Sequence, residues 1–142
     1  MVLPSPSHRQ IFGDLRQGPV PTTEDSKRVE VVSKQPLVDA EQILRKFMRR
    51  AFRRTVTDEE VKPFLARVKA KLDAKYTFEQ AMRVGLKAVL VSPHFLFLRE
   101  QPGKLDDFAL ASRLSYFLWS SLPDEELLTL AEQGKLNQPE TL

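Results

Sequence analysis

The side chains best suited to chemistry in this sequence are the basic residues between positions 45 and 54. They form two rows at the helical spacing of four, Arg45, Arg49 and Arg53 in one and Lys46, Arg50 and Arg54 in the other. Guanidinium groups bind phosphates and carboxylates. Because like charges at this spacing repel one another, we expect acidic groups nearby. The candidate basic interaction face consists of Arg45, Arg49, Arg50 and Arg53.

This basic face has two interpretations. A basic helix, a turn and a second helix could dock on nucleic acid, with the arginines reaching phosphates. In that motif, however, the second helix reads the bases, and the second helix here lacks base-reading Asn and Gln. We therefore expect a solvated or acid-paired face, and nucleic-acid binding through residues 45–54 is the alternative.

Arg113 is the single charged side chain between Asp107 and Trp119, in an otherwise apolar stretch. A guanidinium in such a setting must reach water or meet a carboxylate. We expect a structural ion pair, and an anion-binding role is the alternative. The main candidate partners are Asp107 and Asp124, followed by Glu100 and Glu125.

No catalytic, cofactor-binding or metal-binding set is recognisable. The absence of cysteine excludes disulfides, thiolate metal sites and covalently attached c-type haem within this segment. His94 lies among apolar residues without a second histidine or a cysteine nearby, so we expect a satisfied or exposed imidazole. There is no GxSxG motif and no Gly-rich phosphate loop. Carboxylate chemistry would require residues outside this chain, because Asp106 and Asp107 are typical helix-start residues.

Composition indicates globular structure. Of the 142 residues, 42% are hydrophobic and 29% charged, which is ordinary for folded domains. No apolar run is long enough to span a membrane, and no export signal is recognisable, so the location stays open. Residues 37–101 hold fourteen basic and eight acidic side chains, whereas residues 102–142 hold three and seven. The two parts should attract each other.

The periodicity predicts an all-α fold, a small bundle of about five helices after an irregular, proline-rich lead-in. In the lead-in, Arg9–Phe12 and Val29–Val32 could pair as short strands, but a partly ordered linker is the favoured interpretation. Capping boxes predict helix starts at Thr57 and Thr77. The predicted helices cover residues 38–54, 58–75, 78–91, 107–121 and 123–133.

Particular positions carry further expectations. We expect Gly85 at a close helix crossing and residues 94–98 laid over the core. Residues 105–121 are apolar around most of the helix, which predicts cover on nearly every side. Asp106 should cap that helix, and Gly134 should end the last one.

We divide the chain into a lead-in (1–36), a three-helix module (37–101) and the opening helices of a second domain (102–142). The last residues read as another helix start, so we expect this second domain to be truncated.

Three blocks resemble a known family: ILRKFMRRAFRRTVTDEEV, FEQAMRVGLKAVLVSPHFLFLRE and LDDFALASRLSYFLWSSLPDEELLTLA. Their order is similar to the tandem domains of unknown function fifteen ninety-five and fifteen ninety-two, found in large proteins of planctomycetes and related bacteria. These domains often lie beside a haem-binding domain, but the haem attachment motif has no counterpart here. The resemblance implies exported, multi-domain relatives and brings no activity or catalytic residues.

We therefore interpret the chain as a structural or protein-interaction module of a larger multi-domain bacterial protein. Its expected partners are other domains of that protein. The alternative from another class is a nucleic-acid-binding helical domain.

Overall fold

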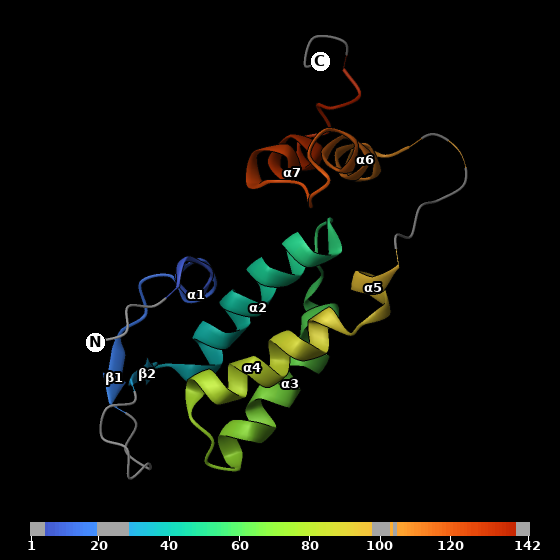
Figure 1. Ribbon diagram of the computed structural model, residues 1–142. Coiled ribbons are helices and arrows are strands. Elements are labelled where there is room, and N and C mark those ends of the chain that lie inside the picture. Colours follow the sequence, from blue (N-terminus) through green and yellow to red (C-terminus); the bar gives the residue numbers. More distant parts are fainter. Residues whose placement is uncertain (1–4, 20–28, 98–102, 104, 139–142) are drawn as a thin grey trace. The chain divides into compact units, whose positions relative to one another are not determined.

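A computed structural model describes residues 5–19, 29–97, 103 and 105–138 of the chain. The fold is mostly helical, as predicted, with one small two-stranded sheet (Figure 1). None of the described helices is long and apolar enough to cross a membrane. The elements are α1 (Pro6–Phe12), β1 (Gln17–Pro19), β2 (Val29–Val31), α2 (Pro36–Phe52), α3 (Asp58–Asp73), α4 (Phe78–Leu90), α5 (Pro93–Leu96), α6 (Asp107–Trp119) and α7 (Glu125–Glu132).

The described residues group into two compact units. Unit 1 comprises the residues up to Arg45 together with Glu59–Ala88, and unit 2 comprises Lys46–Asp58 together with the residues from Val89 onward. The long helix α2 contributes to both units. The predicted domain boundaries after residues 36 and 101 stay a prediction.

The core of unit 1 is built from apolar faces of α2, α3 and α4. Leu44, Val68 and Met82 are fully buried, one from each helix. Gly85 lies where α4 approaches the other two, as predicted: a Cβ there would lie 2.6 Å from Val68 Cγ2 and 3.4 Å from Leu44 Cδ2. The helices pack closely because this glycine has no side chain.

The N-terminal region is more regular than the sequence predicts. Residues 9–12 are not a strand: they belong to α1, which starts after Ser5 with Pro6 in its first turn. The Ser5 hydroxyl accepts a hydrogen bond from the His8 amide at 3.2 Å. Residues 29–31 do form a strand, but their antiparallel partner is β1, with Gln17 opposite Val31.

Unit 2 contains a small core between α6 and α7. Ala111 and Ala131 are buried there with Leu136, and Phe108 and Leu127 pack against them. The end of α7 is a Schellman motif, because the Gly134 amide bonds the Ala131 carbonyl and the Lys135 amide bonds the Leu130 carbonyl. Gly134 has a φ of +63°, as expected for the glycine that ends the helix.

Two expectations about burial in unit 2 are wrong. The helix α6 is not covered on nearly every side: its buried residues are Ala111, Ser112 and Ser115, and its last turn is exposed. Of residues 94–98, Leu96 and Phe97 are exposed and do not cover a core, His94 and Phe95 are half-buried, and residue 98 lies outside the described residues. The buried residues of α6 are thus small ones, and Ala111 is the one that packs in the core with α7.

Replacing Gly85 with alanine should destabilise the chain. Alanine favours a helix by about 1 kcal/mol over glycine, but the new methyl group would collide with the stiff side chain of Val68. Overpacking of this kind costs roughly 1–3 kcal/mol, so we expect a lower midpoint in urea unfolding. The double variant Gly85→Ala/Val68→Ala should lose less stability than the sum of the single variants. A higher midpoint for Gly85→Ala would contradict the close crossing.

Candidate functional site

The best-connected polar group of unit 1 is the carboxylate of Glu79. Its side chain is only 6% exposed although it lies in the first turn of α4. Glu79 Oε2 accepts a hydrogen bond from the Val31 amide at 3.0 Å and lies 3.5 Å from His8 Nε2. Glu79 Oε1 accepts from Arg83 Nη2 at 2.7 Å. One carboxylate therefore joins α1, β2 and α4.

These contacts set the charge state of Glu79. Burial by itself would raise the pKa of Glu79, but the donors from Val31, Arg83 and His8 hold it below its ordinary value. The carboxylate is thus ionised at neutral pH. The neighbouring cavity of about 330 Å³ is lined by His8 and Asp14, among other residues. The contacts of Glu79 hold α1, β2 and α4 together.

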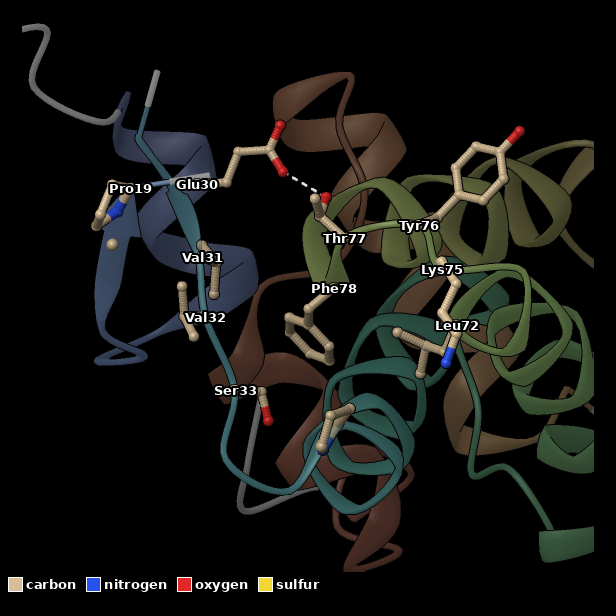
Figure 2. Close-up of a pocket in the computed structure, with 12 residues that line it drawn as sticks. Pro19, Glu30, Val31, Val32, Ser33, Leu72, Lys75, Tyr76, Thr77 and Phe78 are labelled. Atoms are coloured by element: carbon tan, nitrogen blue, oxygen red, sulfur yellow. Dashed lines mark hydrogen bonds between the residues drawn. The ribbon is translucent and has the colours of Figure 1, made fainter. Parts of the chain in front are cut away.

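A second buried carboxylate, Glu30, lies beside a cavity of about 320 Å³ in unit 1. Figure 2 shows Glu30 reaching from β2 toward Thr77, whose hydroxyl donates to Glu30 Oε2. Thr77 also forms the predicted capping box, since its hydroxyl accepts from the Gln80 amide and its amide donates to Gln80 Oε1. The start of α4 is thereby fixed to β2. The walls of the cavity include Val31, Val32, Leu72 and Phe78.

In unit 2 the corresponding polar centre is Arg49. Its Nε and Nη2 donate to the two oxygens of Glu132 at 2.7 and 3.0 Å, and its Nη1 donates to Glu125. The hydrogen bond with Glu132 raises the pKa of Arg49 despite its partial burial, and it lowers the pKa of Glu132. Arg49 therefore ties α2 to both ends of α7.

The other members of the predicted basic face have different surroundings. Arg45 pairs with Glu41 one turn earlier in α2, at 2.9 Å. Arg53 is buried, and Arg50 is exposed. The expected acidic neighbours are thus present for Arg45 and Arg49. The four arginines do not share one environment, and a common interaction face stays a prediction.

Two of the acidic residues predicted to pair with Arg113, Asp107 and Asp124, make other hydrogen bonds. Arg113 is exposed on α6. Asp107 accepts from the Leu136 amide at 2.8 Å and from the Asn137 side chain. Asp124 caps α7 by accepting from the Leu127 amide at 2.8 Å, and Asp106 caps α6 as predicted. Pairing of Arg113 with an acid stays a prediction, and Glu100 lies outside the described residues.

His94, in α5, is half-buried against the ring of Phe52, with 5.3 Å between ring centroids. Its Nδ1 lies 3.5 Å from Arg54 Nη2. Across the part of the chain that the structure describes, no three His, Asp or Glu side chains converge as metal ligands would. The buried serines Ser112 and Ser115 face the protein, and the Ser115 hydroxyl donates to the Ser112 carbonyl.

The most prominent surface feature is apolar. The last four residues of α6 are all large and exposed: Tyr116, Phe117, Leu118 and Trp119. Phe117 is 86% exposed and Trp119 is 62% exposed. Several large exposed apolar side chains in one place often mark a site to which another group binds. We refer to Tyr116–Trp119 as the aromatic end of α6.

The chain is thus a mostly helical protein whose polar clusters hold its elements together. Residues 39–100 match the family model described as protein of unknown function DUF1595, and residues 105–142 match the model described as protein of unknown function DUF1592. The chain carries these two segments in tandem, so the resemblance predicted from the sequence is confirmed. No curated protein and no solved structure matches the chain significantly.

Glu79→Gln should lower the stability of the chain at pH 7 by about 1–3 kcal/mol, because a glutamine amide has one acceptor oxygen where the carboxylate has two, so one donor loses its partner. The folded-state pKa of Glu79 lies below its ordinary 4.5. Its stabilising effect is therefore complete above about pH 4.5 and is lost as the pH falls through the lower folded-state value. Urea unfolding at a series of pH values should show that the free energies of unfolding of the wild-type and Glu79→Gln proteins approach each other at low pH. The control variant Glu59→Gln changes an exposed carboxylate and should show no such pH dependence. A difference in free energy of unfolding between wild type and Glu79→Gln that is the same at all pH values would contradict this role of the Glu79 carboxylate.

The Arg49–Glu132 contact should show measurable coupling. We expect a double-mutant cycle with Arg49→Gln and Glu132→Gln to give about 1 kcal/mol, decreasing with added salt. The exposed Lys69–Asp73 pair, one turn apart in α3, is the matched control and should give about 0.3 kcal/mol. Equal coupling in the two cycles would mean that Arg49 contributes no more than a surface pair.

Proposed function

We propose that the chain is a protein-interaction module that acts through the aromatic end of α6. The observation behind this proposal is the exposure of four consecutive large apolar residues in a helix whose buried side consists of small ones. Aromatic residues are enriched at the centres of protein interfaces. The partner we propose is an apolar surface on another domain of a larger multi-domain protein.

The geometry supports this proposal in a second way. The Ser112 and Ser115 side of α6 is already used inside unit 2, whereas Phe117 and Trp119 contribute almost nothing to the core. Full burial of such a side chain contributes about 1.5–3 kcal/mol. A partner that covers the aromatic end can therefore gain substantial binding energy without disturbing α7.

Nucleic-acid binding through residues 45–54 stays the alternative, with less support. Arg45 and Arg49 engage carboxylates and Arg53 is buried, so fewer cations are available for phosphates. A titration with duplex DNA across salt concentrations separates the two functions, because phosphate contacts give a steep salt dependence.

Phe117→Ser should weaken association through the aromatic end. Without another partner, we expect the chain to self-associate as its concentration rises, since exposed apolar surfaces cover one another. Trp119 is the only tryptophan in the sequence, so its emission should shift to the blue as sedimentation shows larger species. Phe117→Ser should raise the dissociation constant at least tenfold, as loss of a buried phenyl ring predicts.

The matched control is Tyr76→Ser, which removes an exposed aromatic side chain from unit 1. It should leave the association unchanged. A wild-type chain that remains monomeric with unshifted emission at high concentration would contradict the proposed function.

A further inference from the structure

A cavity of about 450 Å³ in unit 2 is separate from the contacts described above. Arg53, Phe95, Leu96, Tyr116 and Leu122 line it. Its volume falls in the range of small-molecule sites, which combine mostly apolar walls with a few polar groups. Arg53 is the charged residue among those that line it.

Arg53 is 8% exposed, and its hydrogen bonds are incomplete. Its Nη2 donates to the Phe95 carbonyl at 3.3 Å. Its Nε is buried and has no hydrogen-bond partner within the described ranges. An unsatisfied donor on a buried cation is costly. The cavity therefore presents a cation to which an acceptor can be added.

The backbone of Arg53 supports the same conclusion. Arg53 directly follows α2 with a φ of +57°, a left-handed conformation that helix ends usually assign to glycine. The arginine thus occupies a position where its side chain brings a backbone penalty. Strained residues of this kind are concentrated at binding sites.

From these observations we infer that the cavity binds a carboxylate attached to an aromatic or branched apolar group. The carboxylate accepts from the Arg53 guanidinium, whose planar edge matches two carboxylate oxygens. The apolar group lies against Phe95, Leu96 and Tyr116. A free phosphate is less well suited to this cavity, because Arg53 and Tyr116 are the polar side chains among the described lining residues and replace only part of its hydration shell. This inference shares Tyr116 with the aromatic end of α6, but its test depends on Arg53, whereas the test of the proposed function depends on Phe117.

Phenylacetate is the first probe, and phenylacetamide is its neutral counterpart. Titration followed by NMR should show phenylacetate binding the full chain at least tenfold more tightly than the amide. Arg53→Gly suits the left-handed backbone and removes the guanidinium, and it should reduce phenylacetate binding at least tenfold. Arg50→Gln removes an exposed charge from the last turn of α2, just before Arg53, and should leave binding unchanged.

A second variant tests the cavity without depending on the folding of Arg53→Gly. Leu122→Trp retains the guanidinium but fills the cavity, and it should also reduce binding at least tenfold. Equal binding of the acid and the amide, or undiminished binding by both folded variants, would overturn the inference.

The carboxylate could come from a free acid or from the end of a polypeptide. An acetylated Ala-Ala-Phe tripeptide with a free C-terminal carboxylate distinguishes these sources. Binding of phenylacetate alone would indicate a free acid, and tighter binding of the tripeptide would indicate a chain end. Failure of both probes would overturn the inference.

Discussion

A carboxylate taken out of water must be surrounded by donors, and in unit 1 that requirement falls on Glu79. The Val31 amide that it accepts from is an N–H of β2 that is not used in pairing with β1, so the carboxylate also occupies the free edge of a strand. His8 and Arg83 complete its surroundings. Together with Glu30, which bonds to Thr77, this carboxylate connects the short N-terminal elements to the helices.

Unit 2 uses the opposite charge for the same purpose. Arg49 binds two glutamates of α7, one at each end of that helix. The apolar contact between α6 and α7 combines the small side chains Ala111 and Ala131 with larger ones, Phe108, Leu110, Leu127 and Leu130. Arg49 adds polar contacts at both ends of α7. The large apolar residues in the last turn of α6 lie outside this core and are exposed.

Local features of this fold could be predicted from the sequence because their causes lie within a few residues. The capping box of Thr77 and Gln80, the cap at Asp106 and the glycine at position 134 all depend on neighbours along the chain. The close crossing at Gly85 was also predictable, since a glycine within an apolar helix face weakens the helix and is retained where a neighbouring element leaves no room for a side chain.

The polar site could not be predicted, because its partners are far apart in sequence. Nothing near Glu79 indicates that His8 or Val31 will meet it, and its spacing from Arg83 fits an exposed pair equally well. The error about α6 has a related cause. A helix that is apolar all around predicts burial, but periodicity cannot say whether a helix is covered within the described chain or by another surface.

The arginines of α2 show why a charge pattern is weak support for a function. A row at a spacing of four looks like one surface, yet Arg45 pairs within its helix, Arg49 bonds to α7 and Arg53 is buried at a helix end. A guanidinium has five donors, and the arginine side chain that carries it has a long apolar stem. Each arginine can therefore bond to whichever acceptor lies near it in the fold. The arginines of this row therefore bond mostly to groups of the protein itself. Arg53, whose buried Nε has no hydrogen-bond partner within the described residues, is the one that indicates a ligand.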